Sequence, residues 1–147
     1  MTDTFSPEPP LIHDVPQIIS PLVRRITANN PGHMTGPGTN TYLIGQNEIA
    51  VIDPGPEDEV HTAAIVEAAK GPIRWILCTH THPDHSPGVP ALKAATGAEV
   101  IAWSNRNGLK TDRRMRDTDR LITDEFELAA VHTPGHAGNH LCFFLEG

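Results

Sequence analysis

The sequence predicts an α/β fold, because segments with helical spacing alternate with short apolar segments typical of strands. Residues 73–79 are a nearly continuous apolar run, as expected of a strand buried on both faces. Apolar residues recur at helical spacing over residues 58–70, with acids in the first turn, and a shorter helix is expected over residues 87–96. A further strand over residues 99–103 completes the alternation.

Antiparallel strands are expected on both sides of this α/β region. They are short apolar segments bounded by Gly, Pro and Asn residues, which favour turns. The expected strands cover residues 22–27, 41–44, 48–52, 126–133 and 140–146. Residues 41–44 and 48–52 are separated by a Gly-Gln-Asn turn, so we expect them to form a hairpin.

The composition indicates one globular domain. The chain has 147 residues, of which 38% are hydrophobic and 20% charged, and it contains no long apolar run. Residues 1–10 are polar and rich in proline, so we expect a disordered tail before a domain that covers residues 11–147. Because the N-terminus does not look like a signal peptide, a cytoplasmic location without membrane contact is the expectation.

The charge pattern argues against a protein that wraps nucleic acid. The formal net charge is -7, whereas that mode of binding needs an excess of Lys and Arg. Residues 106–120 nevertheless contain six of the eleven basic residues, interleaved with aspartates. We interpret this segment as a solvent-exposed loop or helix face, and a patch that binds an anionic substrate is the alternative. The basic residues are Arg106, Lys110, Arg113, Arg114, Arg116 and Arg120.

A dense group of metal-binding side chains follows the strand at residues 73–79. Residues two apart on an extended chain point the same way, so His80 and His82 can aim at one ion. The turn that follows lets Asp84 and His85 face a neighbouring position, and His136, after a later strand, can supply a third histidine. Imidazole and carboxylate suit zinc, with iron or manganese as alternatives. The spacing therefore predicts an open, catalytic site with room for two adjacent ions.

Other polar residues have less specific interpretations. Asp53 is either a turn aspartate at a strand end or the acceptor of a hydrogen bond that orients a ligand histidine. Ser86 is expected to cap the helix at residues 87–96. His61 is expected at the surface, as are His13 and His33. The remaining histidines outside the metal group, His132 and His140, are expected in the interior, and so are the two cysteines, Cys78 and Cys142.

The run from His80 to His85 resembles the HxHxDH signature of the metallo-β-lactamase-fold superfamily, and His136 resembles its next histidine ligand. Residues 39–45, 53–55 and 133–136 are also similar to the glyoxalase II-like and β-lactamase-like protein 2 branches. The resemblance covers about residues 20–147. It implies an αββα sandwich, of which the chain would form mainly the N-terminal half.

The resemblance also implies a metal-dependent hydrolase. In that family His80, His82 and His136 would hold one zinc ion, and Asp84 and His85 would help to hold a second. A metal-activated water then attacks an ester, thioester, amide or phosphodiester of a small-molecule substrate, and small thioesters or esters are the first expectation. Asp84 would orient the water and relay its proton, which makes it the expected catalytic residue.

The sequence departs from the family pattern at Gly147, where it stops before a bridging aspartate and a last histidine ligand. This implies an N-terminal fragment whose exposed sheet face is covered by another chain, for example in a homo-oligomer. Alternatives are an endoribonuclease that contacts RNA through residues 106–120 and a mononuclear-iron oxygenase. A third alternative is a catalytically inactive metal-binding or oligomerising fragment.

Overall fold

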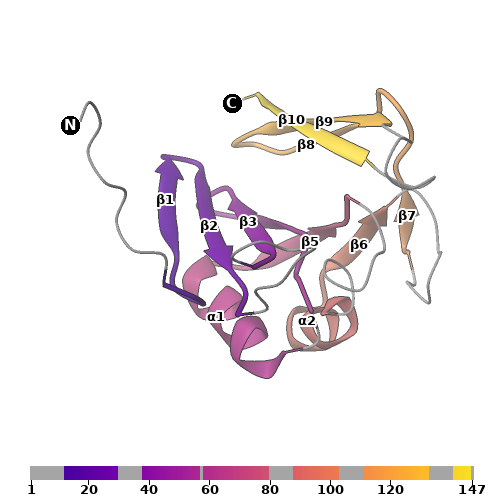
Figure 1. Ribbon diagram of the computed structural model, residues 1–147. Helices are drawn as coiled ribbons and strands as arrows, with labels where there is room; N and C mark the ends of the chain where they lie inside the picture. Colours follow the sequence, from indigo (N-terminus) through magenta and orange to yellow (C-terminus); the bar gives the residue numbers. More distant parts are fainter. Residues whose placement is uncertain are drawn as a thin grey trace, which may run out of the picture.

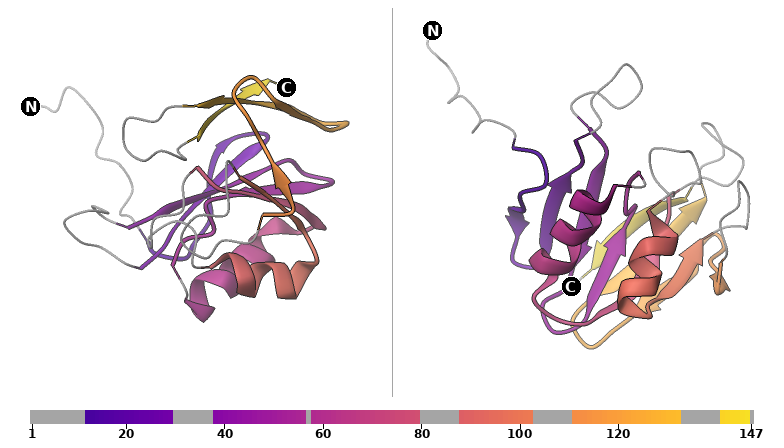
Figure 2. Two further views of the ribbon diagram at one scale, coloured as in Figure 1. Left: turned by 90° about the vertical axis from the view of Figure 1, so that its right-hand side faces the viewer. Right: turned by 90° about the horizontal axis from the view of Figure 1, so that it is seen from below.

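The computed structural model describes residues 12–29, 38–56, 58–79, 88–102, 111–132 and 141–146. Within these ranges the chain forms three layers, with two helices on one face of a large sheet and a smaller sheet on its other face (Figures 1 and 2). The elements are β1 (Gln17–Ser20), β2 (Val23–Thr27), β3 (Asn40–Ile44), β4 (Ile49–Ile52), α1 (Glu59–Ala69), β5 (Ile73–Leu77), α2 (Val89–Thr96), β6 (Glu99–Ala102), β7 (Arg113–Arg114), β8 (Arg120–Ile122), β9 (Glu127–His132) and β10 (Leu141–Glu146).

The large sheet combines antiparallel and parallel pairing. Its strand order is β1-β2-β3-β4-β5-β6-β7. Strands β1 to β4 are antiparallel, and the predicted hairpin is confirmed by the pairing of β3 with β4, in which Tyr42 lies opposite Ile52. From β4 to β7 the strands are parallel. The predicted α/β alternation is therefore confirmed, and the carboxyl ends of β4, β5 and β6 lie at one edge of the sheet.

Helix α1 begins and ends where its sequence predicts. Asp58 is the N-cap, and its side chain accepts a hydrogen bond of 2.9 Å from the Val60 N–H. The helix ends at Lys70, which adopts a left-handed conformation with φ 54°. The Arg24 guanidinium donates to the carbonyl of Ala68 in the last turn, where no intrahelical donor is available. No helix in the described ranges is long and apolar enough to cross a membrane.

Helix α2 starts later than predicted. Gly88 is its N-cap and makes no side-chain capping bond, so the prediction that Ser86 caps this helix is wrong. Pro90 lies in the first turn, where its missing N–H leaves no hydrogen bond unmade. The Gly88 N–H instead donates to the carbonyl of Gly55 at 2.9 Å, which ties the start of the helix to the loop after β4.

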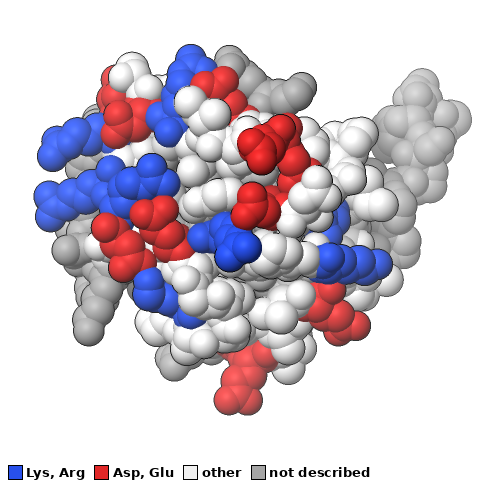
Figure 3. Space-filling model, turned by 180° about the vertical axis from the view of Figure 1, so that it is seen from behind, with Lys and Arg blue, Asp and Glu red and all other residues white. Residues whose placement is uncertain are grey.

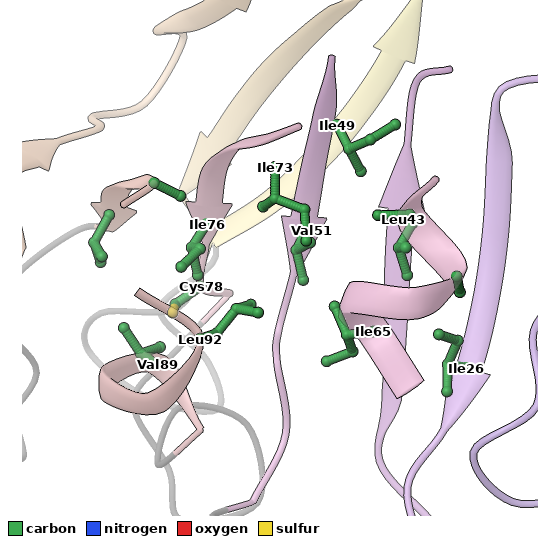
Figure 4. Close-up of a cluster of buried hydrophobic side chains, with 14 of the residues drawn as sticks. Ile26, Leu43, Ile49, Val51, Ile65, Ile73, Ile76, Cys78, Val89 and Leu92 are labelled. Atoms are coloured by element: carbon green, nitrogen blue, oxygen red, sulfur yellow. The ribbon is translucent and has the colours of Figure 1, made fainter. Parts of the chain in front are cut away.

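One apolar core fills the space between the helices and the large sheet (Figure 4). Ile65 of α1 and Leu92 of α2 are fully buried in it with Val51 and Ile76 of the central strands. Cys78 packs in the same cluster, which confirms it as a core residue. Burial raises the pKa of the Cys78 thiol well above its usual range, and the nearby negative charge of Asp53 raises it further.

A second core lies between the two sheets. Because successive strand residues face opposite sides, Leu77 of β5 and Ile101 of β6 point away from the helices. They pack with Leu121, Phe126 and Leu128 of the small antiparallel sheet, whose strand order is β10-β9-β8. In the described residues, the small sheet covers the part of this face that includes Leu77 and Ile101, so the expectation that the face is left exposed is wrong there. The homo-oligomer stays a prediction.

Glu125 links the small sheet to the turn between β3 and β4. Its carboxylate accepts hydrogen bonds from the backbone N–H groups of Gln46, Asn47 and Glu48, at 2.9, 2.8 and 3.1 Å. These bonds stabilise the charged form, and the one from Glu48 contributes most. They hold the pKa of Glu125 below its usual value of 4.5.

The lowered pKa makes this link sensitive to acid. A carboxyl whose folded-state pKa is depressed stabilises the fold fully above its unfolded value and loses that contribution as pH falls through the folded value. We expect the free energy of unfolding to decrease between pH 5 and more acidic solutions, and to decrease less in Glu125→Gln. Urea unfolding across this pH range measures both. Glu67→Gln, an exposed change on α1, should keep the wild-type dependence. Equal acid sensitivity in Glu125→Gln and the wild type would contradict the assignment.

Candidate metal centre

The predicted metal motif follows the central parallel strand of the large sheet. Asp53 comes directly after β4, and Thr79 comes two residues after the end of β5. In open α/β sheets, ligands bind beyond the carboxyl ends of the parallel strands. Thr79, the last described residue before the motif, lies at this edge, so the motif starts where such a site is expected.

The predicted ligands themselves lie outside the described residues. They are His80, His82, Asp84, His85 and His136. Their roles therefore stay predictions. In the described ranges, no three side chains of His, Cys, Asp or Glu form a group that could hold an ion. What those ranges do show is how both ends of the segment 80–87 are held.

Asp53 holds the residue that precedes the motif. Its Oδ1 accepts a hydrogen bond of 2.7 Å from the Thr79 N–H, and its Oδ2 accepts one of 2.6 Å from the Thr79 hydroxyl. Asp53 is only 5% exposed and has φ 55°, in the left-handed region. A buried carboxylate with two short charge-assisted bonds fixes both the backbone and the side chain of Thr79. The further prediction that Asp53 orients a ligand histidine involves rings outside the described residues and stays a prediction.

The other end of the motif is held by the same loop. Besides the bond between Gly88 and Gly55, the backbone of Gly88 lies against three carbonyl groups of residues 54–56. A Cβ at Gly88 would lie 3.0 Å from the carbonyl oxygens of Pro54 and Pro56, so a side chain here would push these carbonyl groups back by a few tenths of an ångström. Residues 53–56 thus anchor the chain immediately before and immediately after the predicted ligands.

A buried histidine lies beneath this loop. His61 of α1 is 0% exposed, so the prediction that it lies at the surface is wrong. It shares the inward face of the helix with Ile65 and Ala68, at spacings of four and seven residues. Its ring nitrogens contact Thr41 Oγ1 and Asp14 Oδ1, both at 2.8 Å, which is why a polar ring is tolerated inside. The helical spacing alone could have placed His61 in the interior.

The basic segment is described only in part, because Arg106 and Lys110 lie outside the described residues. Arg113 pairs with Glu99 at 3.0 Å, and Arg120 pairs with Glu127 at 3.1 Å. These side chains are partly exposed, and Figure 3 shows basic side chains interleaved with acidic ones on the face seen from behind. The charged side chains are exposed as expected, but Arg113, Arg114 and Arg120 lie in strands β7 and β8, so the expected loop or helix face is wrong at these positions.

Several curated proteins resemble the chain in sequence. Lactamase-like protein vrtG of Penicillium aethiopicum is 36% identical over 132 residues, which cover 87% of this chain and 43% of that protein. An atrochrysone carboxyl ACP thioesterase of Aspergillus chevalieri is 38% identical over 141 residues, which cover 93% of this chain and 46% of that protein. The chain thus spans less than half the length of these relatives.

Solved structures share the fold. A Cronobacter sakazakii metallo-beta-lactamase with an HARLDQ motif superposes with a TM-score of 0.75 at 24% identity, covering 89% of this chain and 59% of that one. BJP-1, a subclass B3 metallo-beta-lactamase of Bradyrhizobium japonicum, gives 0.71 at 21% identity, covering 90% and 58%. The sequence profile of the Metallo-beta-lactamase superfamily matches residues 34–147, which include the motif, its anchoring loop, both helices and strands β3 to β10. On this match the chain belongs to the metallo-beta-lactamase superfamily.

Proposed function

We propose that the chain forms the metal-binding part of a hydrolase that cleaves a thioester or ester of a small molecule with a metal-activated water. The observation that carries the proposal is the double anchoring of residues 80–87 by the loop 53–56. Metal and catalytic residues need neighbouring residues that hold them in place, and these hydrogen bonds hold the chain on both sides of the motif. Atrochrysone carboxyl ACP thioesterases among the relatives favour a thioester over other bonds.

The side chains available at this edge suit zinc. We assign His80, His82 and His136 to one ion, and Asp84 and His85 to a second, with iron or manganese as alternatives. Cys78, two residues before His80, is fully buried and packs in the apolar core between the helices and the large sheet, so we do not assign it as a ligand. When bound, such ions lower the pKa of a coordinated water and polarise the scissile carbonyl.

The protein residues have separate tasks in this proposal. The Asp84 carboxylate orients the attacking water and takes up its proton. Asp53 does not touch the substrate, and instead keeps Thr79, and with it the first ligand position, fixed to the sheet edge. The glyoxalase II-like branch and the cytoplasmic location stay predictions.

Hydrolysis of simple acyl thioesters tests the proposal. We expect the zinc-loaded chain to release free thiol, to lose this activity on chelation and to recover it when zinc is restored. Asp84→Asn removes both a proposed ligand of the second ion and the proposed proton acceptor, so we expect it to keep the ion assigned to His80, His82 and His136 and to lose turnover. A chain that binds zinc yet cleaves neither thioesters nor esters would contradict the proposal. It would favour a catalytically inactive metal-binding module.

A further inference from the structure

We propose that His61 is a positioning residue for the metal-binding segment, acting from inside the fold through Thr41 on the loop 53–56. This inference rests on the proposed function, because it takes residues 80–87 as the metal motif. His61 lies in α1, away from every predicted ligand in sequence, and the hydrolase proposal gives it no task.

The geometry is a continuous series of hydrogen bonds. Asp14 Oδ1 lies 2.8 Å from His61 Nδ1, and His61 Nε2 lies 2.8 Å from Thr41 Oγ1. The Thr41 hydroxyl donates to the backbone carbonyl of Asp53 at 2.6 Å. The Asp53 carboxylate then accepts both bonds from Thr79. The series therefore runs from the N-terminal segment, through helix α1 and strand β3, to the residue before the predicted ligands.

Counting hydrogens fixes the direction of these bonds. The carbonyl of Asp53 can only accept, so the single hydroxyl hydrogen of Thr41 points to it. His61 Nε2 must then donate to Thr41 Oγ1. His61 Nδ1 lies within hydrogen-bonding distance of Asp14 Oδ1, so the ring is held at both nitrogens. His61 thus links Asp14 to Thr41 and holds the Thr41 hydroxyl in one orientation.

The ring also supports the loop by direct packing. Gly55 has φ +84°, and a Cβ built there would lie 3.1 Å from His61 Cδ2 and Nε2. The loop backbone therefore rests on the face of α1 at His61. Asp14 is itself held, because its N–H donates to the carbonyl of Thr27 at 2.9 Å. Asp14 and Thr41 therefore hold the ring at its two nitrogens.

Stability alone does not explain a histidine at this position. Replacing both partners of a buried hydrogen bond with apolar groups of the same shape can be nearly neutral or stabilising. A fully satisfied polar network instead fixes one geometry, since any displacement leaves a buried group unpaired. At this position, the fixed geometry is that of the Asp53 backbone and, through it, of Thr79.

Amide hydrogen exchange and zinc affinity test the proposal together. Thr41→Val removes the hydroxyl and keeps the shape, so we expect the Thr79 amide to exchange about tenfold faster and zinc to bind about tenfold more weakly. His61→Gln places an amide nitrogen near the former Nε2 and should keep both readouts near wild type. In His61→Asn the shorter amide can still bond to Asp14 but no longer reaches Thr41, so this variant should resemble Thr41→Val. Thr27→Val is the matched control, because it removes another buried hydroxyl in the same sheet.

The Ile49 amide, which donates to the Pro72 carbonyl, separates local from global effects. Faster exchange at Thr79 with unchanged exchange at Ile49 supports positioning. Equal acceleration at both amides, no change in Thr41→Val, or failure of His61→Gln to preserve the wild-type values would overturn it. If the wild-type chain binds no zinc, the proposed function fails, and the exchange measurements still decide the part played by His61.

Discussion

Changing His80 and His82 together to alanine is expected to remove the metal bound by the purified chain. Both residues are predicted ligands of the same ion, and a zinc site that loses two of three imidazoles keeps too few donors to compete with water. Metal content per chain, measured by plasma spectrometry after dialysis, gives the result. Two ions in the wild type would indicate that both positions are filled, and one would indicate a single working site.

The fold should survive this double change. Both ends of residues 80–87 are held by hydrogen bonds to loop 53–56 that involve neither histidine. We therefore expect an unchanged circular dichroism spectrum, which distinguishes loss of ligands from loss of structure. His13→Ala removes a histidine outside the motif and should leave the metal content unchanged. If the double variant keeps its full metal content, the metal binds elsewhere in the chain.

Phe126→Ala is expected to lower the free energy of unfolding by about 3–5 kcal/mol, the usual range for truncating a buried phenylalanine. Phe126 is 3% exposed and lies in the core between the two sheets. Its ring meets Trp75 of β5 edge to face, with centroids 6.3 Å apart and an interplanar angle of 87°. The truncation removes this contact and leaves a cavity between the layers.

Urea unfolding measures the effect and also the cooperativity of the fold. Ile122→Ala, on the same small sheet but 70% exposed, should change the free energy of unfolding by less than about 0.5 kcal/mol. A loss below about 1 kcal/mol for Phe126→Ala would show that the small sheet adds little to the core. A smaller slope of the free energy of unfolding against urea concentration would show that the two sheets no longer unfold together.

The elements that the sequence predicts well are those with strong local signals. Helix α1 has a capping aspartate at Asp58 and a Gly-Pro stop after Lys70, and β5 is an apolar run of the right length. Strands β1, β7 and β8 were not predicted. They contain four, two and three residues, and their conformation depends on pairing with neighbouring strands more than on their own side chains.

The sequence predicted what kind of site the chain contains, but not the hydrogen bonds that hold the residues next to it. The position of Asp53 at the end of a strand predicts that it lies beside the motif. No local feature of the sequence predicts that it bonds to Thr79, which is 26 residues away. His61 was misplaced because its polarity outweighed its position on the helix face. The small sheet was missed as a layer although strands at residues 126–133 and 140–146 were expected. Short apolar runs identify strands but do not say which sheet they join.

The hydrogen bonds that hold both sides of residues 80–87 to loop 53–56 also affect how metal ions bind and are released. Because loop 53–56 holds both Thr79 and Gly88, the two ends of the segment are brought together before any ion binds, and that entropic cost is not part of binding. The chain then loses less conformational entropy when an ion binds, and gains less when the ion is released, than small zinc domains that fold only around their metal. We expect the empty and loaded chains to have the same layers. Zinc could then be exchanged for iron or manganese on a folded protein, according to which ion the surroundings supply.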